Sequence, residues 1–256
     1  MKFATWNVNS LKVRLQQLVD WLQREQPDVI GLQETKTEDA SFPADELRGL
    51  GFQLLFSGQR TYNGVAILSR AALSDVVSAI PDFADEQRRV LAATVAGMRV
   101  ICVYVPNGES VESPKYRYKL DWLRGFQRWL ARELAQHPRL AVLGDYNIAP
   151  EERDVHDPRL WEGRVLFSEP ERAAFRGLLE LGLKDSFRLF EQPDKSYSWW
   201  DYRMNAFKRN LGLRIDHILL SEELARRATT SRIDKSVRGQ ERPSDHAPVI
   251  TVISDQ

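Results

Sequence analysis

Carboxylate, amide and imidazole side chains gather at the ends of five apolar runs in this sequence. They are Asn7 and Asn9 after FATW, Gln33 and Glu34 after DVIGL, Asp145 and Asn147 after RLAVLG, Asp216 and His217 within LRIDHILL, and Asp245 and His246 before APVITVI. A buried carboxylate is costly unless a cation, a hydrogen bond or a metal ion compensates it. Any one of these residues is compatible with an ordinary polar turn, but the repeated inventory favours one shared site at the rim of a sheet.

This inventory suits the binding of a hard divalent cation. Carboxylate and amide oxygens are the ligands that Mg²⁺ and Mn²⁺ prefer. Zinc would require more histidine or cysteine close together, and the four histidines show no such spacing. We expect His137, which precedes Pro138, to have a surface or capping role, and His156 to be a non-catalytic loop residue.

The stretch RPSDHAP places Asp245 directly beside His246. Adjacent residues on extended chain point to opposite sides, so this aspartate cannot easily orient its own neighbour. Another residue must therefore hold the imidazole ring.

The elements that position these groups are mostly strands. Short runs rich in Val, Ile, Leu and aromatic residues, bounded by Gly, Pro, Asn or Asp, predict strands in KFATWNV, DVIGLQE, FQLLFSG, GVAILSR, VLAATVAG, RVICVYVPN, RLAVLGDYNI, RIDHILLS and APVITVIS. The pair Asn63–Gly64 predicts a turn before one of them. Many of these strands are consecutive, which favours a mixed sheet or two packed sheets with helices outside.

Three helices are expected among the strands. The first follows Ser10 and stops before Pro27, with leucines at helical spacing. The second follows Ser113–Pro114 and ends at His137. The third begins at SEPE, where Ser168 and Glu171 have capping-box spacing, and ends at Gly182.

Composition limits the functional classes. The chain has 256 residues, 43% of them hydrophobic, which allows one large domain or two small ones. Lys+Arg and Asp+Glu are each 36, so any contact with nucleic acid must come from local basic patches. The single cysteine, Cys102, lies in an apolar run and excludes a disulfide framework. No run approaches the roughly 20 apolar residues of a membrane span, and MKFATWNVN lacks the apolar core of a signal peptide. A soluble, cytoplasmic protein is expected.

Seven motifs occur in an order that resembles the exonuclease III family of abasic-site endonucleases, within the endonuclease/exonuclease/phosphatase superfamily. They are TWNVNSLKVR, DVIGLQETK, TYNGVAILSR, VYVPNGE, LGDYNIAP, GLRIDHILLS and RPSDHAP, and they span essentially the whole chain. The resemblance implies an α/β fold, a four-layered sandwich of two mixed sheets flanked by helices, as one catalytic domain over residues 1–256. It also implies Mg²⁺-dependent hydrolysis of DNA, 5′ to abasic sites or at blocked 3′ ends.

The resemblance assigns a role to each motif residue. Glu34 is the principal metal ligand, with Asn7 and Asp245 near the metal. The residues that it assigns to catalysis are Tyr104, Asp145, Asn147, Asp216 and His246. In this assignment Asp145 aligns or deprotonates the attacking water, Asn147 helps to position it, and Tyr104 contacts phosphate. His246 contacts the scissile phosphate, and Asp216 holds that histidine from thirty residues upstream.

Two stretches mix cations with aromatic residues. PKYRYK could be a solvated first helical turn, and YSWWDYRMNAFKRNLGLR could be core packing, but cations can also meet phosphates and aromatic rings can stack on bases. One of the adjacent tryptophans is expected in the core, because they face opposite sides. The family resemblance implies contacts with double-stranded DNA, without sequence preference, by a monomeric protein through Lys36, Arg60, Asn63, Asn107, Lys115, Trp199 and Asn205.

The segment 151–175 is the least typical of the family. Leu166 and Phe167 are bulky and could narrow the pocket that receives a flipped abasic nucleotide. An enzyme that trims DNA 3′ ends, with little cleavage at internal abasic sites, is therefore an alternative. Phosphatases and sphingomyelinases of the wider superfamily are weaker alternatives, because the match spans nearly the full chain and includes RIDH, RPSDHAP and the basic-aromatic stretch. A catalytically idle binding protein of the same fold is also weaker, because this sequence keeps Glu34, Asp145, Asn147, Asp216 and His246.

Overall fold

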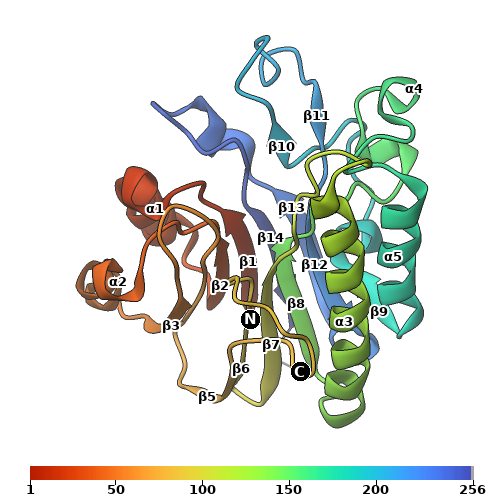
Figure 1. Cartoon of the computed structure of the whole chain (residues 1–256). Coiled ribbons are helices and arrows are strands. Elements are labelled where there is room, and N and C mark those ends of the chain that lie inside the picture. The colour runs from red at the N-terminus through yellow and green to blue at the C-terminus, as the bar shows by residue number, and fades with distance from the viewer. Residues whose placement is uncertain (255–256) are drawn as a thin grey trace.

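Two six-stranded β-sheets face each other in the computed structural model, which describes residues 1–254 (Figure 1). Helices lie on the outer face of each sheet, so the molecule has four layers. The predicted four-layered α/β sandwich is confirmed. The expected domain of residues 1–256 includes two residues, 255 and 256, that lie outside the described part.

The first sheet is mixed, with one parallel pair formed by β1 and β2. Its strands in spatial order are β13 (Ala228–Ile233), β14 (Val249–Ile253), β1 (Lys2–Asn7), β2 (Val29–Gln33), β4 (Val65–Ser69) and β3 (Gln53–Ser57). The second sheet has the same character, with its parallel pair formed by β7 and β8. Its strands are β5 (Leu73–Val77), β6 (Val90–Val95), β7 (Met98–Tyr104), β8 (Leu140–Asp145), β12 (Asp216–Ser221) and β9 (Leu183–Asp185).

A short antiparallel ribbon of β10 (Trp199–Trp200) and β11 (Gly212–Leu213) stands beyond one end of the sandwich, at the top of Figure 1. Trp199 forms an isolated bridge to His246. The ribbon therefore lies over the end of the sandwich that carries the polar residues of RPSDHAP.

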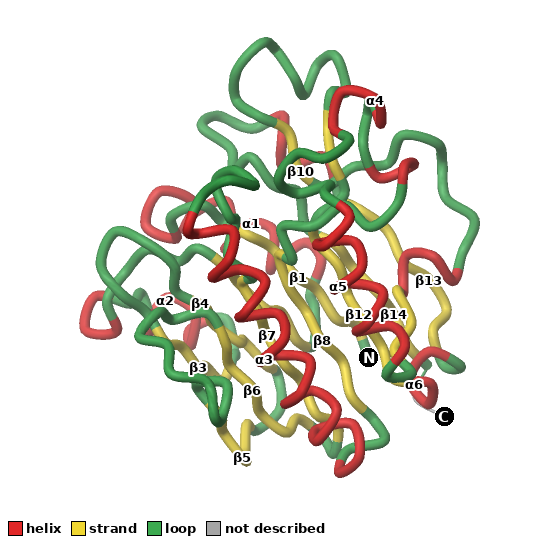
Figure 2. The backbone as a smooth tube through the Cα atoms, turned by 45° about the vertical axis from the view of Figure 1, so that its right-hand side comes forward, coloured by secondary structure: helices red, strands yellow, loops and turns green. Residues whose placement is uncertain are grey.

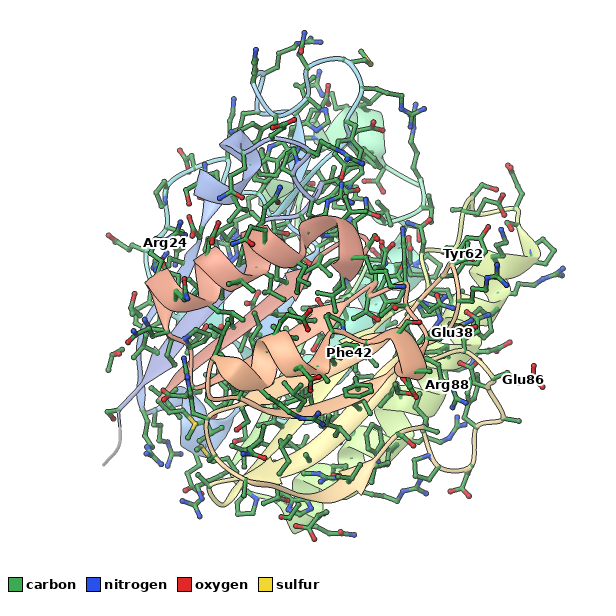
Figure 3. The ribbon with its side chains drawn as sticks, turned by 90° about the vertical axis from the view of Figure 1, so that its left-hand side faces the viewer. Arg24, Glu38, Phe42, Tyr62, Glu86 and Arg88 are labelled. Carbon is green, nitrogen blue, oxygen red and sulfur yellow. The ribbon has the colours of Figure 1, made fainter. Side chains whose placement is uncertain are left out.

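The described residues form six α-helices, four of which cover the outer faces of the sheets. The six are α1 (Leu11–Glu25), α2 (Ala44–Gly49), α3 (Pro114–Gln136), α4 (Pro158–Trp161), α5 (Glu169–Glu180) and α6 (Glu222–Ala225). Figure 2 shows α3 and α5 crossing the second sheet, and Figure 3 shows α1 and α2 over the first. Within the described residues, no helix is both long enough and apolar enough to cross a membrane.

The helix boundaries follow local sequence signals. Ser113 accepts a hydrogen bond from the amide of Lys115 at the start of α3, and Ser168 and Glu171 form the predicted capping box of α5. Ser10 behaves differently from the prediction. Its side chain makes no cap hydrogen bond, and the first amide of α1, that of Leu11, donates to the backbone carbonyl of Thr35 in the loop after β2 at 3.0 Å.

Three apolar layers fill the sandwich. One lies between the sheets and contains Phe3, Ile67 and Leu143. A second packs α1 and α2 on the first sheet, and a third packs α3 and α5 on the other. Cys102 is buried in the layer between the sheets, as a structural strand residue.

Candidate active site

Strand register gathers the site residues of the second sheet. Asp145, at the end of β8, lies opposite Asp216 of β12 on one side and Tyr104 of β7 on the other. In the first sheet, Asn7 at the end of β1 lies beside Gln33, which directly precedes Glu34. These strand ends meet at one end of the sandwich, as the sequence predicts for a shared site.

Asn7 joins the two sheets across this end. Its Nδ2 atom donates to Glu34 Oε1 at 2.8 Å and to Asp145 Oδ2 at 2.9 Å. Its Oδ1 atom accepts from the backbone amide of Asn9 at 2.9 Å. Because Asn7 is fully buried, it fixes the two carboxylates relative to each other.

Glu34, Asp145 and His246 form a group that could hold a metal ion. Each offers one ligand atom, and these atoms lie within 4.8 Å of one another. The carboxylate oxygens of Glu34 and Asp145 are the ligands that a hard divalent cation prefers, whereas His246 could ligate a metal only as a neutral imidazole.

Asp245 is placed differently from the other predicted metal residues. Its two carboxylate oxygens accept hydrogen bonds from Asn9 Nδ2 and Trp199 Nε1, each at 2.9 Å. Asn9 in turn accepts from Lys36 Nζ at 2.6 Å, and Lys36 pairs with Glu34 at 2.9 Å. Asp245 is therefore linked to the candidate metal ligand Glu34 through Asn9 and Lys36.

His246 is held by Asp216, thirty residues upstream, and not by its sequence neighbour. The Nδ1 atom of His246 lies 2.9 Å and 3.1 Å from the two carboxylate oxygens of Asp216. Ser198 donates to Asp216 Oδ2 at 2.7 Å. The other ring nitrogen, Nε2, lies 3.7 Å from Asp145 Oδ2 and faces the carboxylate group.

Burial and neighbouring charges shift the pKa values of His246, Asp145 and Tyr104. Burial disfavours a charged imidazole, but the negative charges of Asp216 and Asp145 outweigh it and raise the pKa of His246 to about 10. Burial raises the pKa of Asp145 to about 7, against the opposing charge of His246. Burial and the charges of Glu34 and Asp145 hold the pKa of Tyr104 well above its usual range. The site thus combines a cationic histidine with a carboxyl that can exchange a proton near neutral pH.

Asn147 sits in a tight turn directly after Asp145. Its φ angle is 50°, a left-handed conformation that asparagine tolerates better than most residues. Its backbone amide donates to Asp145 Oδ1 at 2.9 Å, and its Nδ2 donates to the carbonyl of Val105 at 3.0 Å. Its Oδ1 accepts from Asn107 Nδ2 at 3.1 Å. The GDYN and VPNG motifs are therefore in direct contact.

Residues 4–246 match the Endonuclease/Exonuclease/phosphatase family. The chain belongs to this family. It is 37% identical to exodeoxyribonuclease III of Haemophilus influenzae, over 97% of this chain and 98% of that protein. The family resemblance inferred from the seven motifs is confirmed.

Solved structures of the same family share the whole fold. The 3′ phosphatase NExo from Neisseria, bound to a product DNA hairpin, superposes with a TM-score of 0.98 at 47% identity, over 99% of each chain. An AP endonuclease from Archaeoglobus fulgidus superposes with a TM-score of 0.95 at 37% identity, again over 99% of each chain.

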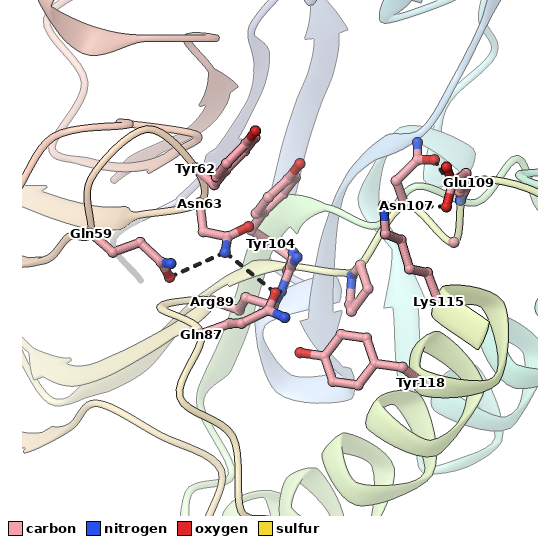
Figure 4. Close-up of a pocket in the computed structure, with 12 residues that line it drawn as sticks. Gln59, Tyr62, Asn63, Gln87, Arg89, Tyr104, Asn107, Glu109, Lys115 and Tyr118 are labelled. Carbon is pink, nitrogen blue, oxygen red and sulfur yellow. Dashed lines mark hydrogen bonds and ion pairs between the residues drawn. The ribbon is translucent and has the colours of Figure 1, made fainter. Parts of the chain in front are cut away.

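A cleft of about 610 Å³ opens in the surface of this family member, and Tyr104, the strand partner of Asp145, lies in its wall (Figure 4). Four residues from the sequence prediction line it: Asn63, Tyr104, Asn107 and Lys115. Arg89 and Tyr62 line it as well. The structure thus brings the loop between β3 and β4, the residues before β6, the end of β7 with the loop after it, and the start of α3 to one surface.

Other predicted DNA-side residues lie outside this cleft. Arg60 is exposed in the loop between β3 and β4, and Asn205 is exposed beyond β10. Trp199 lines a separate apolar hollow with Trp161, Met204 and other residues. Its neighbour Trp200 is fully buried in the core, as expected for adjacent residues that face opposite sides.

Leu166 forms part of an apolar wall behind Trp199. It packs in a buried cluster with Leu213 and Ile215, against which Trp199 is also packed. Its φ angle of 77° lies in the left-handed region, which is unfavourable for a branched side chain. The predicted narrowing residue is therefore held in a strained position next to the tryptophan.

Several residues that support the site were not predicted from the sequence. Ser198 orients Asp216, and its oxygen also accepts from the amides of Ile215 and Asp216. Lys119 and Glu171 form a buried ion pair beneath the Asn147 turn. A serine in an aromatic stretch and a lysine at a helical position give no local signal of such contacts, because the contacts are made with distant segments.

Proposed function

We propose that this protein is a DNA repair nuclease that hydrolyses phosphodiester bonds at abasic sites and at DNA 3′ ends with the help of a divalent cation. The observation that carries the proposal is the convergence of Glu34, Asp145 and His246 within 4.8 Å, with Asp216 behind the histidine. The names of its relatives, an exodeoxyribonuclease III, a 3′ phosphatase and an AP endonuclease, support the same reaction class.

Glu34, with Asp145 and His246 near it, holds the cation, which we propose to be Mg²⁺, with Mn²⁺ as a substitute. When bound, the cation neutralises the phosphate charge and stabilises the leaving oxygen. Asn7 keeps Glu34 and Asp145 in register through its two donated hydrogen bonds. Asp245 supports this side of the site through Asn9 and Lys36.

The remaining residues act on the phosphate and the water. Asp145 accepts a proton from the attacking water, because a neighbouring cation keeps this carboxylate ionised. Cationic His246 donates a charge-assisted hydrogen bond to a phosphate oxygen, and Asp216 maintains its charge and orientation. Tyr104 lies beside Asp145 at the edge of the cleft, and Asn147 fixes the carboxylate of Asp145 through its backbone amide.

The cleft of Figure 4 receives the DNA backbone in this proposal. Lys115, Arg89 and the side-chain amides of Asn63 and Asn107 offer donors to phosphate oxygens. Lys36, Arg60 and Asn205 extend these contacts, and Trp199 faces the sugar. Contacts with the phosphate backbone do not depend on the base sequence. Binding to double-stranded DNA should therefore weaken steeply as the salt concentration rises.

The direct test uses a duplex that carries one abasic analogue. With Mg²⁺ the strand should be nicked 5′ to the lesion, and EDTA should stop the reaction. Replacing the proton acceptor in Asp145→Asn should lower kcat by about 10³-fold, within the range for lost acid–base catalysis. The matched control is Asp20→Asn on the exposed face of α1, which should leave kcat unchanged. Full activity in EDTA would refute the cation mechanism.

A second candidate is a nuclease confined to 3′ ends, and the Leu166 wall favours it. Leu166 is buried against Leu213 and Ile215, beside the tryptophan that faces the sugar. A duplex with a blocked 3′ end, assayed beside the internal abasic site, separates the two candidates. If only the 3′ end is processed, Leu166→Gly should restore nicking at the abasic site, because glycine tolerates the φ of 77° and opens the wall.

The cellular setting completes the proposal. We expect one catalytic domain acting as a monomer in the cytoplasm, where bacterial DNA is repaired. Sedimentation with and without a DNA hairpin measures the monomeric state, and a dimer in both conditions would contradict it.

A further inference from the structure

Lys119 is a lysine of α3 that has no exposed surface. Its ammonium group has three donors, and all three are used. One goes to the carboxylate of Glu171, one to the backbone carbonyl of Asn147 at 2.7 Å, and one to the backbone carbonyl of Asn107 at 3.0 Å. A single buried cation therefore holds the turns that carry two polar residues of the candidate site.

Glu171 is the other half of the buried pair, and it is equally inaccessible. Besides Lys119, it accepts hydrogen bonds from the backbone amides of Leu166 and Ser168, at 3.0 Å and 3.1 Å. The same carboxylate thus completes the capping box of α5 and holds Leu166 in its left-handed conformation.

The pair therefore ties together three segments that are far apart in the sequence. They are the turn at Asn107, the turn at Asn147 and the loop at Leu166. The first two turns meet in the hydrogen bond from Asn107 Nδ2 to Asn147 Oδ1, and the amide of Asn147 donates to the carboxylate of Asp145. A shift of either backbone would move these donors relative to the reacting phosphate.

A buried ion pair is a poor way to gain stability. Replacing both members with apolar residues of similar volume is often neutral or stabilising, whereas removing one member leaves a buried charge without a partner. What an apolar replacement cannot supply here is the two hydrogen bonds from Lys119 to the carbonyls of Asn107 and Asn147.

We propose that Lys119 and Glu171 are positioning residues of the nuclease site, which fix the backbones of Asn107 and Asn147 so that their side chains meet the phosphate and the water. This inference rests on the proposed nuclease function. Neither residue touches the reacting atoms, and both act through the two asparagines.

The main test removes both charges at once, in the double variant Lys119→Met/Glu171→Leu. We expect kcat on a DNA duplex to fall by about 10–100-fold, as for small displacements of catalytic groups, while KM changes by less than about 3-fold. The matched control is Arg99→Met/Glu133→Leu, which removes the buried ion pair between Arg99 of β7 and Glu133 of α3, distant from the site, with Nε to Oε2 at 2.5 Å. Its kcat should stay within about 2-fold of the wild type. An unchanged kcat in the folded Lys119 double variant would overturn the proposal.

A double-mutant cycle with Asn147→Ala separates positioning from general damage. If Lys119 acts through Asn147, its replacement should cost much less in kcat once Asn147 is absent. Fully additive losses would overturn the proposal. Should the double variant fail to fold, Glu171→Gln serves in the same cycle, because glutamine keeps the shape and one acceptor oxygen.

A third measurement does not need activity. The side-chain amide resonances of Asn107 and Asn147, followed by ¹H–¹⁵N NMR, should shift in the Lys119 double variant and not in the Arg99 control. Unshifted resonances would refute the positioning role. If the wild type has no nuclease activity but the Lys119 double variant still shows the shifts, the proposed function is refuted and the contact network stands.

Discussion

The chain contains two Asp–His dipeptides, and the structure uses them in opposite ways. In Asp216–His217, at the start of β12, the aspartate faces the site and the histidine faces the core. In Asp245–His246, before β14, the histidine faces the site and the aspartate lies to one side of it. The Asp–His pair that forms at the candidate site, Asp216 with His246, takes one member from each dipeptide.

The two histidines are both buried, yet their charges differ. His217 Nδ1 lies 3.0 Å from the guanidinium of Arg214, and its Nε2 donates to the carbonyl of Ile148 at 2.9 Å. Burial and the charge of Arg214 lower the pKa of His217 to about 4, so the ring is neutral. His246 faces two carboxylates, and its pKa is raised to about 10. Because both rings are buried, the neighbouring charges account for the difference between their pKa values.

The largest expected effect comes from removing the charge that holds His246. Asp216→Asn keeps the size of the side chain but loses the negative charge, so the pKa of His246 should fall. The weakened hydrogen bond to the phosphate should lower kcat by about 10²–10³-fold, as for a lost oxyanion donor. Steady-state nicking of an abasic duplex measures the effect.

Melting temperature is the control for that variant. Circular dichroism should show a folded protein, because asparagine can still accept from Ser198 and His246. A folded Asp216→Asn protein with wild-type kcat would show that His246 acts without the negative charge of Asp216. The difference between the two dipeptides would then have no effect on activity.

A smaller effect, on stability, is expected from His217. With a pKa of about 4 in the folded state against 6.5 for an unperturbed histidine, the unfolded chain binds more protons between these values. The stabilisation is complete above pH 6.5 and is lost as the pH falls toward 4. From pH 6.5 to pH 5 the loss is about 2 kcal/mol in the free energy of unfolding.

The measurement must be a difference between two proteins. Asp145, with a pKa raised to about 7, contributes with the opposite sign over the same range. Urea unfolding of wild type and His217→Gln at both pH values cancels that contribution, and glutamine can still donate to Ile148 and accept from Arg214. Equal pH slopes in the two proteins would mean that His217 is not held neutral.

The smallest expected effect is on the Mg²⁺ dependence of activity, in the variant Asp245→Ala. This change removes the acceptor of Asn9 and Trp199, and Asn9 supports the Lys36–Glu34 pair. The Mg²⁺ concentration for half-maximal activity should rise about tenfold, as for other residues that support a metal ligand indirectly. Activity at saturating Mg²⁺ should change by only about 2-fold in the same titration. A collapse of activity at every Mg²⁺ concentration would place Asp245 in the chemistry itself.

Much of the fold follows from local sequence. The three long helices begin and end where Ser113, Ser168 and the prolines predict, and all nine predicted strands form. Five strands were not predicted: β5, β9, β10, β11 and β13. β5 and β13 lie at sheet edges with polar, exposed residues, and the other three have only two or three residues. Such strands form because a neighbour offers hydrogen bonds, which no local pattern records.

The sequence by itself determined the inventory of the site. Apolar runs had to become strands, their polar ends had to collect at a rim, and adjacent residues such as Asp245 and His246 had to diverge. Only the tertiary structure decided which residues touch. The meeting of the two sheets places Asn7 against Asp145, and Lys119 under Asn147, across sequence separations that no local signal spans. The charge of each histidine was decided there too, because a pKa depends on the neighbours that packing supplies.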